Sequence, residues 1–227
     1  MRRFSFMLLL LLPVLSRAQD CNPFYAMRQG VTASYAYYDA KDKKTSSSST
    51  TIREIKNISG GVEAEVAMTM MDKTGKEMFQ GTTRVICRND TLFMDVGSLV
   101  NPGLAQSAGK MEMSMTGDGM TIPGNLRAGM LLPDSHNEFS MGMNGMTLMT
   151  ISIDISEHKV EAEEKITTPA GTFDCFRVSY LSNAKTTLLK TSTRTVQWYS
   201  KGVGIVKMES YDKKGELESR MLLTGLQ

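Results

Sequence analysis

Alternation of apolar and polar residues dominates the chain, and it predicts β-strands. Every second residue of Val62–Met70 is apolar, so an extended strand there would present one apolar face. The segment Val31–Tyr38 alternates in the same way. No segment before Ile151 has a sustained helical period of apolar residues. We therefore expect an all-β fold.

The polar run Thr45–Thr51 admits two interpretations. Its serines and threonines have the composition of a linker. Threonine also favours extended backbone, and three isoleucines follow the run within a few residues. We favour a polar strand, for which the edge of a sheet is the natural position.

Short turns separate the expected strands. Asp72–Gly75 and Asp212–Gly215 share the pattern Asp-Lys-X-Gly, in which aspartate can bond the turn and glycine can adopt a positive φ. Asn144-Gly145 is a strong hairpin signal, and Thr168–Gly171 suits a type I turn. This spacing predicts roughly ten to twelve strands in a sandwich or barrel. The segment Ser98–Lys110 is expected to form one short helix or an irregular cap.

The stretch from Lys159 to Met208 predicts two hairpins, with either a β-bulge or burial on both faces of the sheet. Phe176, Val178 and Tyr180 have one parity, whereas Phe173 and Cys175 have the other. The single tryptophan, Trp198, is expected to anchor the core of this region because large rings dominate core energetics.

Methionine is concentrated in the middle of the chain. Nine of the 19 methionines lie between Met111 and Met149. They could fill irregular gaps in the core, line a pliable cavity for an apolar ligand, or bind monovalent copper. The residues expected to line such a cavity are Met111, Met113, Met115, Met141 and Met143.

The first eighteen residues have the features of an export signal. Two arginines precede an apolar run that is too short to span a bilayer as a helix, and Ser16-Arg17-Ala18 fits a signal peptidase site. Cleavage removes three arginines, so the net charge changes from +2 to about −1. Gln19 and Asp20 are large for the residues before a lipid-modified cysteine, which favours soluble export over a lipid anchor.

Export permits a disulfide, and the mature chain has three cysteines. We expect Cys21 to pair with Cys87, which would tie the N-terminus to a strand. Cys175 lies in an apolar strand and is expected to be a small buried side chain.

The sequence contains no motif that predicts catalysis. Phosphate loops, HExxH and GxSxG are absent. His136 is interpreted as a loop residue, His158 as a turn residue, and the glutamates Glu161 and Glu163 as a wet strand face. We therefore predict no catalytic residue, cofactor or metal site, and no nucleic-acid partner because no basic stripe interleaves with aromatic rings.

Four segments together resemble the TapB-like group of exported β proteins of Bacteroidota. These are Met94-Asp95, Leu126–Asp134, Thr168–Cys175 and Trp198–Lys207. The resemblance covers nearly all of the mature chain and implies a curved antiparallel sheet, similar to the half-barrel of lipoprotein carriers. It supplies no functional residue, because the group has no established activity.

These observations predict a signal peptide at residues 1–18 and one β domain at residues 19–227. The expected function is non-catalytic binding of an apolar small molecule or lipid by a periplasmic or secreted protein, with an envelope protein as a further candidate partner. The alternative is a structural or protein-interaction domain with a fully packed core. Copper binding through the methionine-rich strands is the third and least favoured hypothesis.

Overall fold

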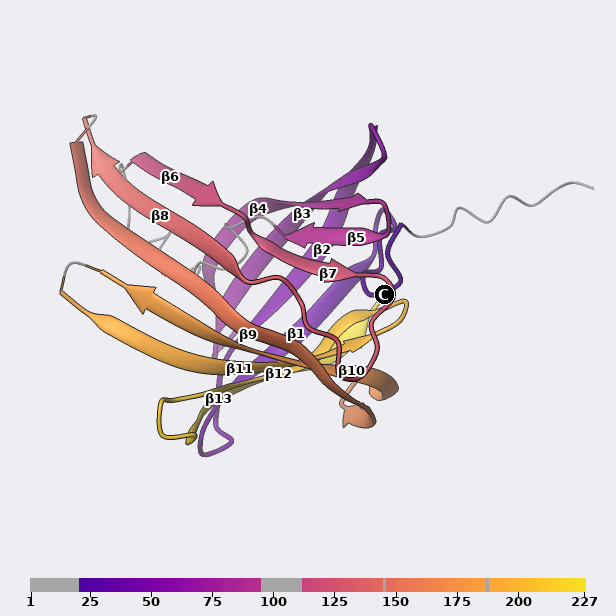
Figure 1. The fold of residues 1–227 in the computed structure, drawn as a ribbon. Helices are drawn as coiled ribbons and strands as arrows, with labels where there is room; N and C mark the ends of the chain where they lie inside the picture. The colour runs from indigo at the N-terminus through magenta and orange to yellow at the C-terminus, as the bar shows by residue number, and fades with distance from the viewer. Residues whose placement is uncertain (1–20, 95–111, 145, 187) are drawn as a thin grey trace, which may run out of the picture.

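The structure is a computed structural model that describes residues 21–94, 112–144, 146–186 and 188–227. Of Glu112, Met113 and Met115 only the backbone is described. Within these ranges the chain forms thirteen strands and no helix, and all of the strands belong to one antiparallel sheet. Figure 1 shows this sheet curving around a single interior. The predicted all-β fold with a curved antiparallel sheet is confirmed.

The strands follow one another along the chain with short connections, apart from the segment between β5 and β6. The bounds are β1 Thr32–Asp39, β2 Lys44–Ile58, β3 Gly61–Asp72, β4 Glu77–Arg88, β5 Thr91–Met94, β6 Glu112–Gly117, β7 Met120–Pro123, β8 Ser135–Met143, β9 Met146–Thr168, β10 Gly171–Lys185, β11 Lys190–Ser200, β12 Gly204–Tyr211 and β13 Leu217–Leu226. The helix or cap predicted for Ser98–Lys110 lies outside the described residues.

The order of strands in the sheet is β6-β8-β9-β10-β11-β12-β13-β1-β2-β3-β4-β5-β7. The strands at its two edges, β6 and β7, are separated in the chain only by Asp118 and Gly119. Three Cα–Cα steps span at most about 11 Å, so the two edges must come close together. The sheet therefore wraps around its interior, although β6 and β7 do not pair and the barrel stays open.

Two glycines allow the chain to pass from one edge to the other. Gly117 and Gly119 have φ values of +135° and +67°, a region that residues with a side chain rarely adopt. A Cβ atom on Gly117 would also lie 2.4 Å from the carbonyl oxygen of His136. Asn137 supports the connection because its side-chain oxygen accepts a hydrogen bond from the Gly119 amide at 2.8 Å.

The main core lies at one end of this wrapped sheet. It draws buried side chains from eight strands that span almost the whole sheet order, and from the segments before β1 and after β7. Its members are Phe24, Met27, Ile52, Ala64, Val66, Val85, Cys87, Leu92, Ile122, Leu126, Leu132, Val160, Val178 and Tyr199. The ring of Phe24 is fully buried and meets the ring of Phe176 edge to face, with 5.4 Å between centroids.

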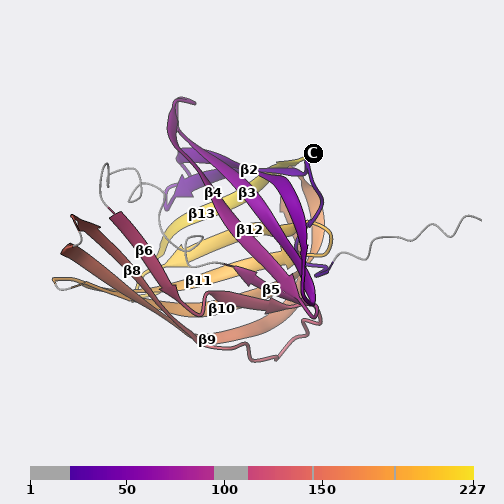
Figure 2. The same cartoon turned by 90° about the horizontal axis from the view of Figure 1, so that it is seen from above.

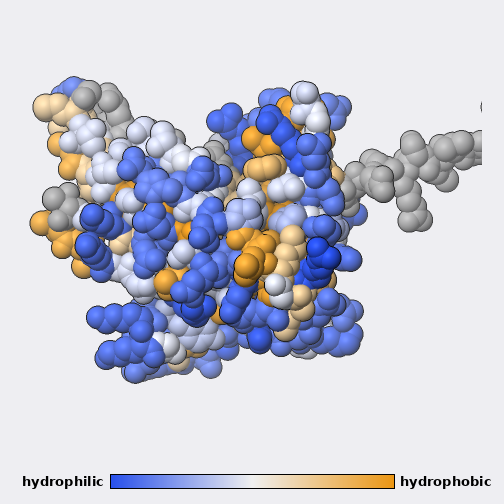
Figure 3. Space-filling view, viewed as in Figure 1, coloured by the Kyte–Doolittle hydropathy of each residue, from blue (hydrophilic) through white to orange (hydrophobic). Residues whose placement is uncertain are grey.

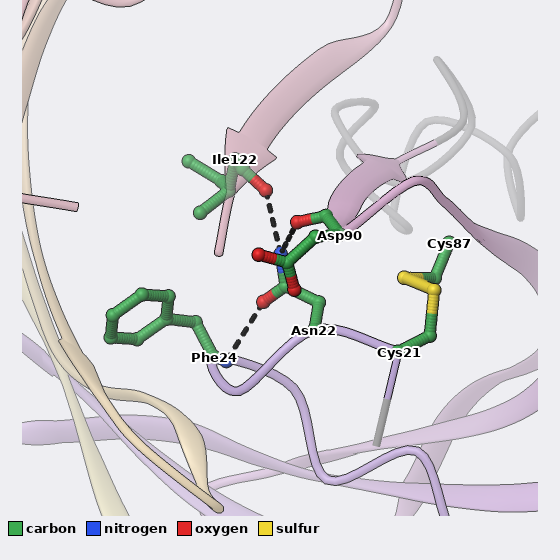
Figure 4. Close-up of a disulfide and its surroundings, with 6 residues drawn as sticks. All are labelled: Cys21, Asn22, Phe24, Cys87, Asp90 and Ile122. Carbon is green, nitrogen blue, oxygen red and sulfur yellow. Dashed lines mark hydrogen bonds between the residues drawn. A yellow bond between two sulfur atoms is a disulfide. The ribbon is translucent and has the colours of Figure 1, made fainter. Parts of the chain in front are cut away.

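The N-terminal segment is fixed in this end by both covalent and polar bonds (Figure 4). Cys21 and Cys87, the pair chosen from the sequence, are joined by a disulfide. The fully buried amide of Asn22 donates to the carbonyl oxygens of Asp90 and Ile122, each at 2.9 Å. Its oxygen accepts a hydrogen bond from the Phe24 amide at 2.8 Å. Asn22 therefore links the entering segment to two other parts of the sheet.

A second cluster of buried side chains lies in the region where the sequence predicted a bulge or two-sided burial, and the pairings of β10 with β9 and of β11 with β12 have register shifts there. Trp198 and Cys175 pack there with Val206 and Leu223. The indole nitrogen of Trp198 donates to Glu164 at 2.7 Å, and Lys207 lies 4.3 Å above the ring. The prediction that Trp198 anchors a core is confirmed.

Two predictions from the polar pattern are wrong. The serine-rich strand β2 pairs with both β1 and β3 and is not an edge strand. It is tolerated inside the sheet because the Ser48 hydroxyl is buried against that of Tyr37, at 3.1 Å. His158 is not a turn residue; it is 2 % exposed in β9, where its ring packs edge to face on Tyr180.

The two Asp-Lys-X-Gly turns have the predicted chemistry, and a third hairpin shares it. Asp72 and Asp212 each accept hydrogen bonds from the amides two and four residues later. Asp39 does the same in the β1–β2 turn. There Asp42 has a positive φ of 59°, in the role that glycine has in the other two turns.

No helix in the described ranges is long and apolar enough to cross a membrane.

We expect Asn22→Ala to lower the free energy of unfolding by about 3 kcal/mol, because the Ile122 carbonyl and the Phe24 amide lose this buried partner and the Asp90 carbonyl keeps only the Gly124 amide. Denaturant unfolding with the disulfide intact measures this loss. Asn57→Ala, at an exposed position of β2, is the control and should change the stability by less than about 0.5 kcal/mol. Equal effects of the two substitutions would contradict the linking role of Asn22.

His158 should make the fold sensitive to acid. Burial lowers the pKa of its imidazole, against a smaller opposing effect of the hydrogen bond to Pro133 and the charge of Asp134. The unfolded chain then binds the proton more readily, so stability is lost as the pH falls below about 6.5. We expect His158→Gln to unfold with a weaker dependence on pH between about 7 and 5.

His136 provides a control, because its pKa is shifted in the opposite direction. It lies exposed on β8, where the hydrogen bond from its Nδ1 to Asp154 raises its pKa. The stabilisation by this pair is present at low pH and is lost as the pH rises through the raised pKa. As the pH falls across this range, the free energy of unfolding measured with urea should rise relative to the wild type for His158→Gln and fall for His136→Gln. A change in the same direction for both variants would contradict the burial argument.

Candidate functional site

The concave side of the sheet continues beyond the main core as a surface rich in methionine. Val66 belongs to the core, and strand alternation places Met68 and Met70 on the same face of β3. We call this surface the methionine face. It is defined by half-buried methionines on four strands: Met68, Met70, Met94, Met149 and Met208.

Cross-strand register extends the methionine face to both arms of the sheet. Met70 pairs with Ser48 on one side and with Phe79 on the other. On the opposite arm, Met149 pairs with Met141 of β8. Met94 packs against the main core and also against the cluster of Met120, Ile155 and Tyr180. The interior contacts therefore connect strands that are distant in the sheet order.

A line of polar side chains crosses this apolar surface. The Tyr199 hydroxyl donates to the side-chain oxygen of Gln197 at 2.6 Å. The Gln197 amide faces the Tyr180 hydroxyl at 3.4 Å and the sulfur of Met208 at 3.6 Å. Burial raises the pKa of Tyr180 to about 12, so its hydroxyl stays neutral and available for hydrogen bonding.

His158 lies beside this polar line. Its Nδ1 donates to the carbonyl oxygen of Pro133 at 3.2 Å. Its other ring nitrogen is buried and has no hydrogen-bond partner among the described residues. With its lowered pKa, the imidazole presents an unpaired acceptor to the interior rather than a charge.

The space beside Phe24 is too small for a lipid. A cavity of about 70 Å³ is bounded there by side chains that include Phe24, Ile52, Leu92, Tyr199 and Ile205. A water molecule occupies about 30 Å³ of the liquid, so the cavity could hold about two waters. The end of the sheet that holds the N-terminal segment is therefore closely packed.

A wide groove of about 710 Å³ also lies on the outer side, between the β9–β10 hairpin and the turn at Lys201. Lys165 and Asp174 form an exposed ion pair along it, with 2.6 Å between nitrogen and oxygen. Cys175 borders the groove, but burial raises the pKa of its thiol to about 11. The thiol is consequently protonated at neutral pH and is a poor nucleophile.

Two glutamates of β9 are held in ion pairs on this outer side, whereas Glu163 is exposed and forms none with the described residues. Glu161 lies 3.0 Å from Arg177 and accepts a hydrogen bond from Ser179. Glu164 contacts Arg177 at 3.3 Å and accepts the indole proton of Trp198. These contacts bind the outer strands together. Within the described part of the chain, no group of three or more His, Cys, Asp or Glu residues is arranged to hold a metal ion.

Only two of the five methionines predicted to line a cavity, Met141 and Met143, have described side chains. Met111 lies outside the described residues. The backbones of Met113 and Met115 pair with Met141 and Phe139. Met141 is buried against Phe139, whereas Met143 is 46 % exposed at the end of the β8–β9 hairpin. An irregularity between Met141 and Gly142 shifts the register between these two positions.

Sequence reasoning missed that Met94 and Met208 contribute to the same surface as Met68 and Met70. The alternation of Val62–Met70 did predict that Met68 and Met70 share one face of a strand. Met208 could not be assigned to a face in advance, because its strand is offset from β11 between Trp198 and Tyr199.

Solved structures share the fold. A protein of Parabacteroides distasonis thought to be a lipoprotein is 26 % identical, with a TM-score of 0.76 over 92 % of this chain and 100 % of that one. A protein of Bacteroides fragilis with a YmcC-like fold, thought to be exported, is 23 % identical, with a TM-score of 0.75 over 91 % and 100 %. No curated protein matches the chain.

A family model covers most of the chain. It matches residues 28–223 and describes a DUF3108-like family. This match does not confirm the TapB-like name that the motifs suggested. The chain belongs to the DUF3108-like family.

Proposed function

We propose that this chain is an exported envelope protein that binds an apolar ligand, such as the acyl chain of a lipid, on its methionine face. Export is supported by the signal at residues 1–18 and by the two structural neighbours, which are thought to be an exported protein and a lipoprotein. The Cys21–Cys87 disulfide is also consistent with an oxidising compartment. The proposed activity is binding without catalysis.

One observation carries the binding proposal. Methionines on both arms of the curved sheet remain half-buried on its concave side, whereas the neighbouring core residues are fully packed. A partly exposed thioether loses solvent contact when an apolar molecule covers it, and each CH₂ group removed from water contributes about 0.8 kcal/mol. The unbranched side chain also adapts to the shape of the ligand.

The polar line across the face would orient such a ligand. The Tyr180 hydroxyl and the unpaired nitrogen of His158 lie next to apolar surface, and their rings are 5.6 Å apart. An apolar site with a few convergent polar groups is the usual composition of a small-molecule pocket. A protonated carboxylic acid or a hydroxyl group on the ligand could donate to that nitrogen.

The alternative is a structural or protein-interaction domain. It is favoured by the small cavity beside Phe24 and by the size of the main core. Under this alternative the methionines on the concave side would serve only to fill gaps between strands.

The two functions can be separated with palmitic acid as the probe. We expect the delipidated chain from Gln19 onward to bind palmitic acid, and Met68→Gln with Met208→Gln to weaken this binding by about tenfold, because the amides must lose water. Displacement of a fluorescent fatty acid gives the affinity, and native mass spectrometry gives the stoichiometry.

Met78→Gln is the matched control, since Met78 is an exposed thioether on β4 that lies beside Phe79 in sequence but outside the methionine face. It should leave the affinity unchanged. If wild-type protein binds no palmitic acid and carries no lipid after purification, the structural alternative is the correct one.

A further inference from the structure

Two hairpins end in exposed apolar side chains. In the β8–β9 hairpin these are Met143, Met146 and Leu148. In the β10–β11 hairpin they are Leu188 and Leu189, which are 96 % and 61 % exposed. Both hairpin ends project toward the same side of the molecule in the two perpendicular views (Figures 1 and 2). Figure 3 shows hydrophobic surface at these ends. We call them the apolar tips.

The tip of the β10–β11 hairpin is ordered by local hydrogen bonds. The hydroxyl of Thr186 accepts from the amides of Leu188 and Leu189, at 3.3 and 2.9 Å. The Thr186 amide donates to the carbonyl oxygen of Leu189 at 2.8 Å. The backbone is thereby folded back so that both leucine side chains point away from the sheet into solvent.

The β8–β9 tip extends beyond the end of β10. Lys185, at the end of β10, pairs with Ser152, and β9 continues from there to Met146. Six further residues in extended conformation add about 20 Å. On the side of β10 this part of β9 has no partner strand, whereas on the other side β6 pairs with β8 as far as Gly142.

The charged residues that flank the β10–β11 tip have one sign, whereas Glu112 of β6 pairs with Gly142 beside the β8–β9 tip. No Asp, Glu, Lys or Arg occurs from Phe139 to Ile153, whereas the β1–β2, β3–β4 and β12–β13 turns each carry aspartate and lysine. The β10–β11 tip is flanked by Lys185 and Lys190, which face each other across the hairpin and are both exposed. No acidic residue lies between them in the chain.

We propose that the apolar tips dock the protein onto an anionic phospholipid surface. The leucines and methionines enter the boundary between headgroups and acyl chains, and the two lysines contact the headgroup phosphates. This combination of apolar insertion and basic flanking residues is the one that gives interfacial binding. The inference does not depend on ligand binding at the methionine face, because the tips are a separate surface.

The shape of the tips favours a lipid surface over a folded protein. A stable protein interface buries about 800 Å² on each partner in a closely complementary patch. The tips instead present five apolar side chains on two separate projections. Fluid lipid can surround each projection without a matching shape, so the tips need no rigid complementary partner.

Vesicle flotation tests the proposal with the chain from Gln19 onward, which has no lipid anchor of its own. We expect binding to vesicles of phosphatidylcholine with phosphatidylglycerol and much weaker binding to pure phosphatidylcholine. Leu188→Ser with Leu189→Ser should weaken it by roughly tenfold. Lys185→Gln with Lys190→Gln should weaken it by about fivefold per lysine, and added salt should remove that difference.

Leu131→Ser is the matched control, because Leu131 is 78 % exposed but lies between β7 and β8, away from the tips. It should bind vesicles like the wild type. Equal binding by wild type and the Leu188/Leu189 variant, or no vesicle binding by the wild type, would overturn the proposal. So would sedimentation data in which the leucine substitutions abolish self-association and leave vesicle binding unchanged. Palmitic acid binding should persist in the tip variants, which separates this proposal from the binding function.

Discussion

The N-terminal segment that enters one end of the curved sheet is the constraint on which the rest of the structure depends. Phe24 fills the centre of the main core, and Asn22 supplies hydrogen bonds to two separate carbonyl groups. The disulfide closes a loop between residues 66 positions apart, and a loop of that length can stabilise a fold by about 4 kcal/mol. A single-layer sheet has no opposite layer to bury its concave face, so an inserted segment must do this.

This arrangement divides the interior into two parts. Near Phe24 the space between side chains is reduced to a small cavity. Farther from it, the methionine face combines half-buried thioethers with a short line of hydroxyl and amide groups. The passage through Gly117 and Gly119 joins the two edges of the sheet, and it keeps both arms around a common interior. The closed part holds the main core, and the more open part is the surface that we propose to bind an apolar ligand.

The strands and many turns could be predicted from the sequence, because period-two alternation and aspartate turns are local signals. The burial of Trp198 also followed from its parity and size. The position of β2 could not be predicted, since its hydroxyls find partners only in the folded sheet, as in the hydrogen bonds of Ser48 with Tyr37 and of Thr51 with Thr32. The different environments of Met141 and Met143 depend on a shift in register, and the insertion of Asn22 depends on contacts across 68 to 100 residues of sequence. Such features arise from the tertiary fold and produce no periodic pattern in the amino-acid sequence.

The central claim is that an apolar ligand covers the methionine face, and the methionine methyl groups report on it directly. Nuclear magnetic resonance spectra of protein labelled with ¹³C at these methyl groups should be recorded during a titration with palmitic acid. We expect the signals of Met68, Met70, Met94 and Met208 to shift, while that of Met78 stays in place. Unchanged signals from the methionine face, or shifts confined to Met143 and Met146 at the apolar tip, would contradict the account.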